Sequence, residues 1–238
     1  MPLRHLTARV RSRIANVRLA AMLAFAAGMV DVSGYLGLKQ FTSHMTGITA
    51  TLAAAAGTDA PALLAHTAVI LLSFLSGAAV CALLVNFARR RGRESLFALP
   101  LFLEALLLGA VGVTRGQSHV LLLLGVLAFA MGLQNAIITK ISDAEIRTTH
   151  LTGMVTDIGI EIGRALYLSR NPFQEPIRAH RERIGMLVLL VGSFFAGGLL
   201  GAITFPRFGF VTFVPLAMVL ATPTVFPILD DLRGIHEP

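Results

Sequence analysis

Long apolar segments follow one another along almost the whole chain, separated by short polar stretches. Six of them approach or exceed the roughly 18–20 residues that a helix needs to cross the hydrocarbon core of a bilayer. These runs cover about residues 17–38, 62–88, 96–113, 119–139, 184–204 and 209–229. The pattern predicts an all-α integral membrane protein with about six transmembrane helices.

Two further segments are shorter or more polar than these runs. Residues 44–57 form an apolar stretch that a Gly-Thr-Asp-Ala-Pro sequence ends, and this stretch is too short to cross as a full helix. Residues 150–168 carry Asp157, Glu161 and Arg164, which would be costly if they faced lipid. We therefore predict two short or re-entrant helices in addition to the spans.

Composition agrees with this class of protein. Of the 238 residues, 55% are hydrophobic and 14% are charged, and the mean hydropathy is +0.75. Because about a quarter of the residues of a soluble domain are charged, the shortage of charge excludes an ordinary soluble domain. The single cysteine, Cys81, leaves no internal disulfide and no thiolate metal site.

The positive charge is better explained by membrane topology than by nucleic acid. A formal net charge of +7 would indicate a nucleic-acid partner in a soluble protein. Here the arginines gather in residues 1–18, 89–93 and 164–183, where the positive-inside rule places cytoplasmic charge. All three arginine-rich stretches lie on one side of the membrane only if residues 44–57 and 150–168 do not cross it. We predict cytoplasmic N- and C-termini, a lipid bilayer as partner and no nucleic acid.

The two halves of the chain repeat each other. A His-x-Thr-Gly motif occurs at residues 44–47 and again at 150–153. Three other pairs of short matches keep the same order: 28–31 with 132–135, 73–78 with 193–198, and 100–101 with 215–216. We predict a duplication that forms one membrane domain.

The predicted repeats are residues 1–116, of which 1–16 form a basic cytoplasmic tail, and 117–238. Three crossings in each half force the second half to insert upside down, as a 3+3 inverted repeat. Arg-rich residues 4–18 and the apolar run after them also have the composition of a signal peptide. Because the repeat pairs this run with a mid-chain segment, we expect a retained first span.

Short hydrophobic segments at matching positions of inverted repeats indicate a transporter-like binding site. The threonines could cap exposed amides at the helix starts, the glycines allow close backbone approach, and the histidines could donate to an anion or carry a proton. The predicted binding residues are His44, Thr46, Gly47, Gln134, Asn135, His150, Thr152 and Gly153. The alternative is that these residues only cap two helices and pack against neighbours.

Acidic residues inside apolar segments are candidates for proton or ion coupling. They are Asp31, whose repeat counterpart is Asn135, together with Glu104 and Asp157. Asp157 is preferred because it lies nearest a motif, whereas its counterpart in the first half is Thr51. Glu161 and Arg164 share its helix face and are expected to form a structural pair.

Other kinds of chemistry lack a sequence signal. The chain has no Walker lysine pattern and no Rossmann glycine fingerprint, no zinc-binding histidine spacing and no nucleophile elbow. We predict no catalytic residue, no cofactor and no metal. A GxxxG sequence at residues 197–201 indicates close helix packing or a homo-oligomer.

At these motifs the sequence resembles the YoaK family of bacterial multi-span membrane proteins, which is classed as a domain of unknown function. The resemblance runs from about residue 17 to 229 and rests on Gly28–Asp31, the two His-x-Thr-Gly motifs, Gly132–Ala136 and Thr156-Asp157. It implies a protein of the bacterial cytoplasmic (inner) membrane and no particular activity. In the family pattern an asparagine usually follows the first Thr-Gly, where this chain has Ile48, so the first half-site here is expected to be altered.

Together these features predict a secondary transporter or channel for a small polar or anionic solute. The alternative is a membrane scaffold, assembly factor or sensor that transports nothing. An intramembrane enzyme has less support, because no nucleophile accompanies His150 and Asp157.

Overall fold

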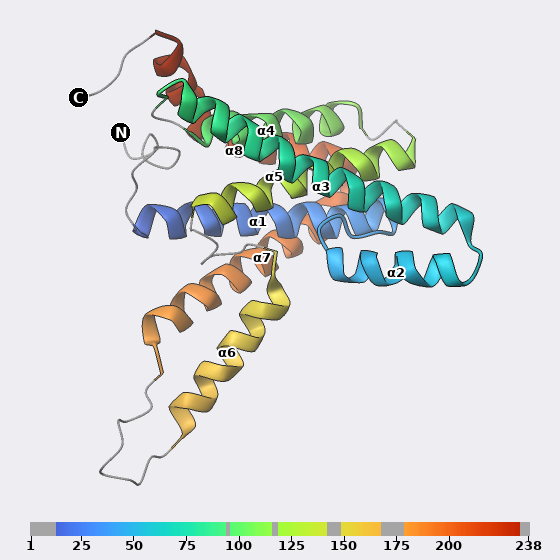
Figure 1. Cartoon of the computed structure of the whole chain (residues 1–238), viewed down its shortest axis with the longest axis horizontal. Coiled ribbons are helices and arrows are strands. Elements are labelled where there is room, and N and C mark those ends of the chain that lie inside the picture. The colour runs from blue at the N-terminus through green and yellow to red at the C-terminus, as the bar shows by residue number, and fades with distance from the viewer. Residues whose placement is uncertain (1–12, 94–95, 116–118, 142–148, 168–178, 234–238) are drawn as a thin grey trace.

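The chain folds into helices joined by short connections (Figure 1). The computed structural model describes residues 13–93, 96–115, 119–141, 149–167 and 179–233. Its helices are α1 (Arg13–Leu38), α2 (Met45–Gly57), α3 (Pro61–Arg90), α4 (Ala98–Val113), α5 (Val120–Ile141), α6 (Leu151–Leu166), α7 (Arg181–Phe208), the 3-10 helix η2 (Gly209–Thr212) and α8 (Phe213–Arg233). These ranges contain no strand, and the prediction of an all-α fold is confirmed.

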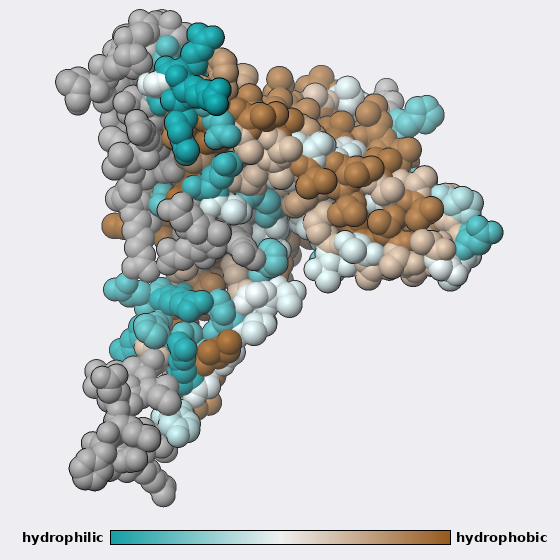
Figure 2. All heavy atoms as spheres, viewed as in Figure 1, coloured by the Kyte–Doolittle hydropathy of each residue, from teal (hydrophilic) through white to brown (hydrophobic). Residues whose placement is uncertain are grey.

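The helices have the apolar length of a membrane protein. Four stretches are long and apolar enough to cross a bilayer: Ile14–Leu38, Pro61–Arg90, Val120–Ile141 and Arg181–Leu229. Helix α4 is equally apolar but has only 16 residues. Apolar side chains also cover much of the outer surface, which Figure 2 shows as a broad hydrophobic area. The chain is a helical membrane protein.

Three helix pairs form the body of the bundle. Helix α1 packs most extensively against α7, α3 against α5, and α4 against α8. The buried core includes Leu23, Leu127 and Phe213. The short helices are attached more loosely, α2 to α3 and α6 to α7. Figure 1 shows α6 and the first turns of α7 projecting away from the body.

Glycines bring α1 and α7 into backbone contact. A Cβ atom added to Gly28 would overlap the carbonyl oxygen of Phe194, and one added to Gly197 would overlap that of Phe25. Phe25 faces Gly197 and, one turn further along both helices, Met29 faces Gly201, so the two helices are parallel. The predicted GxxxG sequence is therefore used within the chain, against α1.

Helices α3 and α5 meet in the same way. A Cβ atom added to Gly132 would overlap the carbonyl oxygen of Phe74, and one added to Gly77 would overlap that of Phe129. Each of the four helices thus contributes a Phe-x-x-Gly sequence to its crossing. Because small residues let membrane helices approach closely, the sequence fixes where these crossings form.

The remaining pair, α4 and α8, is antiparallel. Gly109 lies beside Ala217 and Gly112 beside Val214, so residue numbers run in opposite directions along this contact. The starts of α1 and α7 and the ends of α3 and α5 lie toward the left of Figure 1. Hydrophilic side chains gather along this same side in Figure 2.

Candidate functional site

The first His-x-Thr-Gly motif is held by a buried carboxylate of α1. Oδ1 of Asp31 accepts hydrogen bonds from the backbone N–H groups of Thr42 (3.0 Å) and Ser43 (2.9 Å) and from the Thr42 hydroxyl (3.1 Å). The Ser43 hydroxyl donates to Oδ2. Asp31, Thr42 and Ser43 are all buried. Asp31 therefore anchors the loop that leads into α2.

The second motif is held by the corresponding residue of α5. Oδ1 of Asn135 accepts a hydrogen bond from the hydroxyl of Thr149 at 2.6 Å, just before the motif. The Asn135 amide also donates to the carbonyl oxygen of Met131, at 2.9 Å. Asp31 and Asn135 thus act alike, because each holds a residue that directly precedes a motif.

These anchors place the starts of α2 and α6 away from the ends of the long helices. Asp31 lies seven residues before the end of α1 at Leu38, and Asn135 six residues before the end of α5 at Ile141. At 1.5 Å of rise per residue, each of these anchoring residues lies about 10 Å before the end of its helix. Both short helices begin near the middle of the molecule in Figure 1.

The caps of these helices differ from the sequence prediction. His44 and His150 occupy the N-cap positions, and neither side chain makes a capping hydrogen bond. The prediction that Thr46 and Thr152 cap amides is wrong, because both residues lie inside the first turn. In the described structure no acceptor bonds to the N–H groups of Thr46, Gly47, Thr152 or Gly153. Each helix start thus presents free donors and the positive end of its dipole.

The two histidines have different surroundings. A Cβ atom added to Gly47 would lie 2.8 Å from Nδ1 of His44, whereas one added to Gly153 would lie 3.9 Å from Nδ1 of His150. The His44 ring also meets the ring of Phe41 edge-on, with 6.3 Å between centroids. Both histidines are exposed, so their rings are accessible to a solute.

Ile48, which stands where the family resemblance implies an asparagine, is a packing residue in this chain. Its side chain is buried in a small cluster with Ile70 of α3 and with Leu124 and Ala128 of α5. In this chain the position joins α2 to the bundle.

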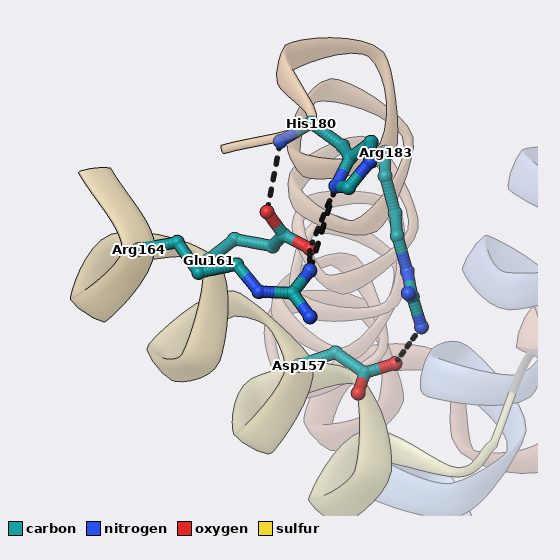
Figure 3. A network of polar contacts seen from close by, with 5 residues as sticks. All are labelled: Asp157, Glu161, Arg164, His180 and Arg183. Atoms are coloured by element: carbon teal, nitrogen blue, oxygen red, sulfur yellow. Dashed lines mark hydrogen bonds and ion pairs between the residues drawn. The ribbon is translucent and has the colours of Figure 1, made fainter. Parts of the chain in front are cut away.

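Charged residues of α6 pair with the start of α7 (Figure 3). The Arg183 side chain donates to Oδ2 of Asp157 at 2.9 Å, and the Arg164 side chain donates to Oε1 of Glu161 at 2.8 Å. Oε2 of Glu161 accepts a hydrogen bond from the backbone N–H of His180 at 2.8 Å. The predicted Glu161–Arg164 pair is confirmed, and Asp157 has a partner that lies 26 residues further along the chain.

The hydrogen bond from the His180 backbone lowers the pKa of Glu161 below its usual 4.5, with help from the Arg164 and His180 side chains and against the effect of burial. Because docking lowers this pKa, the stabilisation is complete above about pH 4.5 and is lost as the pH falls through the lower, docked value. We expect α6 to stay on α7 at pH 5 and to separate in stronger acid. In Glu161→Gln the contact should be weaker and should lack this acid transition.

Spin labels at the exposed positions Ala165 and Val188, with Cys81 replaced, would report the distance between the two helices. Asp157→Asn is the control, because Asp157 pairs separately with Arg183. An acid transition that persists unchanged in Glu161→Gln would contradict this account.

Two predicted polar residues are buried in the body of the bundle. Nε2 of Gln134 donates to the carbonyl oxygen of Leu23 at 2.8 Å and ties α5 to α1, while its Oε1 has no partner in the described part of the chain. Glu104 of α4 is fully buried, and neither carboxyl oxygen has a partner among the described residues. An ionised carboxylate without a partner is very unstable in such a place, and an acid buried inside a membrane helix is a hypothesis for a functional site.

An open groove of about 660 Å³ lies between α3, α4 and α5, away from the motifs. Its walls are mostly apolar and include Leu107, Leu122 and Phe129. A polar solute would find few partners there. Within the described ranges, no three His, Cys, Asp or Glu side chains gather closely enough to hold a metal ion.

Sequence reasoning missed the residues that hold the site in place. Thr42, Ser43 and Thr149 anchor the motif loops, and His180 and Arg183 complete the α6 cluster. The sequence contained a signal for the loop anchors, because hydroxyl residues precede the histidine in both copies of the motif. The α7 partners had no comparable signal.

These features define a class, that of helical membrane proteins in which two short helices begin at matched motifs held by the preceding helix. Residues 19–226 match the family described as "Protein of unknown function (DUF1275)", and the chain belongs to this family. It is 27% identical over 206 residues to the UPF0700 transmembrane protein YoaK of Bacillus subtilis (strain 168), with 84% of this chain and 89% of that protein covered. The predicted resemblance to the YoaK family is confirmed. No solved structure matches the chain.

Proposed function

We propose that this protein is a secondary transporter or channel for a small polar or anionic solute. One observation carries the proposal. Both short helices begin at a His-x-Thr-Gly motif, and a polar residue of the preceding long helix holds each start back from the end of that helix. Non-helical backbone at membrane depth is tolerated only where it is buried in protein or lines a water-filled cavity.

An inverted repeat of residues 1–116 and 117–238 accounts for the packing. Under this arrangement α1, α2, α3 and α4 correspond to α5, α6, α7 and α8. The α1–α7 contact then corresponds to the α5–α3 contact, and both use the same Phe-x-x-Gly pairs. Helix α4 and its counterpart α8 are antiparallel, as an inverted repeat requires. Six helices would cross the bilayer, and α2 and α6 would enter it only in part.

The charges favour one orientation. The ends of α3 and α5 and the start of α7 carry seven basic residues: Arg89, Arg90, Arg91, Arg93, Lys140, Arg181 and Arg183. The positive-inside rule assigns this side to the cytoplasm. We infer cytoplasmic N- and C-termini in a bacterial inner membrane.

The free amides and dipoles of the two helix starts would attract the anionic part of a solute, as at other helix N-termini. His44 and His150 would donate further hydrogen bonds from their exposed rings. The second start has more open space, because His150 lies further from Gly153 than His44 does from Gly47. The solute is therefore expected to bind the second half more closely.

The candidate coupling residues differ in their burial and in their partners. The carboxylate of Asp31 is occupied by its loop, and Asp157 is paired with Arg183 near solvent. Of the three, Glu104 is the one that is buried and has no partner among the residues that the structure describes. We therefore assign the coupling proton first to Glu104, and Asp157 is the second candidate.

Flux in proteoliposomes tests the proposal. We expect purified protein to move one of the probe anions chloride, phosphate, acetate or lactate. The double variant His44→Ala, His150→Ala should reduce this flux about tenfold or more, because hydrogen bonds to a charged solute are lost. The melting temperature should not change, because neither ring makes a capping bond. Glu104→Gln should abolish the dependence of flux on a pH gradient and leave solute exchange intact.

His66→Ala is the matched control, because Nδ1 of His66 bonds within its own helix, to the carbonyl oxygen of Ala62. Flux by the double histidine variant equal to that of the control would refute the assigned site. Flux no greater than in protein-free liposomes, for every probe, would count against transport.

A scaffold or sensor is the second candidate. Helix α6 projects from the body and exposes Val155, Ile162 and Leu166, which could contact another membrane protein. Stable partners in a pull-down, lost on polar substitution of these residues, would favour this function if no solute moves.

A further inference from the structure

The turn that follows α3 carries four arginines, and two of them lie over one aromatic ring. Arg89, Arg90, Arg91 and Arg93 lie within five residues. The Cζ atom of Arg91 lies 5.3 Å from the centroid of the Phe87 ring, and that of Arg93 lies 5.7 Å from it. At these distances a guanidinium is attracted to the face of a ring. Two of the four cations are therefore held in defined positions.

Gly92 creates this arrangement. Its φ of 65° lies in the left-handed region, where a residue with a side chain is strained. The N–H of Gly92 donates to the carbonyl oxygen of Arg89 at 3.2 Å, and that of Arg93 donates to Ala88 at 3.0 Å. The chain thus turns back on the end of α3 and returns Arg93 to the ring that Arg91 also contacts.

The positive charge of this turn is not neutralised by the rest of the described structure. The ion pairs of the described residues lie within α6 or between α6 and the start of α7, and none of them includes an arginine of this turn. A guanidinium that rests on a ring keeps its N–H donors free at its edge, in the fork geometry that matches two phosphate oxygens. The turn therefore has the chemistry of a phosphate site.

Its position selects a lipid as the source of that phosphate. Helix α3 is one of the helices long and apolar enough to cross a bilayer, and it exposes Leu72, Leu75 and Leu83 along its length. The Phe87 ring, which is 46% exposed, lies where this apolar surface meets the arginines. Hydrophilic residues meet the hydrophobic surface at the left side of Figure 2, toward which α3 ends. Acyl chains along α3 would place a headgroup beside the turn.

We propose that the turn formed by Phe87 and residues 89–93 binds the phosphate of an anionic phospholipid. The inference is independent of transport, because it concerns a different part of the molecule. The proposed site also differs from the general attraction of anionic lipids to basic residues at the cytoplasmic surface. Such a preference depends on charge alone, whereas this site depends on how Gly92 and Phe87 hold the guanidinium groups.

Thermal unfolding of the full chain in detergent, with increasing phosphatidylglycerol, tests the site. We expect the melting temperature to rise and saturate, as it does for a ligand of the folded state. The double variant Arg91→Gln, Arg93→Gln should need about tenfold more lipid for the same rise, since charged hydrogen bonds are lost. Gly92→Ala keeps every charge but opposes the turn, and it should respond in the same way.

The matched control is the double variant Arg115→Gln, Arg207→Gln, which removes the same charge elsewhere and should respond like the wild type. An equal loss in this control, or none in Gly92→Ala, would mean that charge alone acts and would overturn the proposal. An equal rise with phosphatidylcholine, or with inorganic phosphate, would refute recognition of an anionic lipid. If the arginine variant does not fold, native mass spectrometry of Gly92→Ala decides, because retention of phosphatidylglycerol as in the wild type contradicts the site.

Discussion

Replacing Gly28 with alanine is expected to push α1 away from α7 and to remove a large share of the stability of the bundle. The added Cβ atom would overlap the carbonyl oxygen of Phe194, which is part of the α7 backbone and cannot rotate away as a side chain can. Overpacking in a core usually costs about 1–3 kcal/mol, and a backbone clash between two helices belongs at the upper end, about 3 kcal/mol or more. Gly132→Ala should have a similar effect, because it meets the carbonyl oxygen of Phe74 in the same way.

The measurement is the melting temperature in detergent, together with the yield of monodisperse protein. Gly192→Ala is the control in the same helix pair, because a Cβ atom there meets nothing within 4 Å. If Gly28→Ala melts at the same temperature as Gly192→Ala, the helices are not in the backbone contact described here.

Replacing Asp31 with alanine is expected to release the start of α2. The variant leaves the buried N–H groups of Thr42 and Ser43 without an acceptor, along with both hydroxyl groups. Hydrogen bonds to a charged group contribute about 1.5–3 kcal/mol each, and they are not additive, so we expect a loss of about 3 kcal/mol or more. Asp31→Asn should lose less, because its carbonyl oxygen can still accept from the backbone, as Asn135 accepts from Thr149.

Amide hydrogen exchange of residues 42–48, with the melting temperature, would measure this effect. Asp59→Asn is a suitable control, because Asp59 is exposed and its φ of 51° is a conformation that asparagine tolerates. Unchanged protection of the Thr42 and Ser43 amides in Asp31→Ala would show that the carboxylate does not hold the loop.

The hydrophobic pattern by itself determined where the helices lie. The apolar run at 62–88 became α3 over Pro61–Arg90, and the run at 119–139 became α5 over Val120–Ile141. The two shorter segments became α2 and α6, each beginning directly after the histidine of its motif. These features are local, because the length of an apolar run and the position of a breaking sequence depend only on neighbouring residues.

The sequence also indicated which residues correspond between the halves, because the motifs recur in the same order. It could not assign their roles. Asp31 and Asn135 were predicted to serve coupling and binding, and the structure uses both to hold loops. Asp157 was preferred for coupling, and it pairs with Arg183 of another helix.

Only the tertiary structure decided which polar groups are satisfied. Glu104 and Asp31 look alike in sequence, as single acids inside apolar runs. Among the described residues, however, Glu104 has no partner, whereas Asp31 accepts four hydrogen bonds. The GxxxG of α7 could have joined two copies of the chain, and its glycines face α1 instead. The physical reason is the same in each case. A hydrogen bond or a backbone contact joins residues that are far apart in the chain, and a local sequence pattern cannot predict which of them come together.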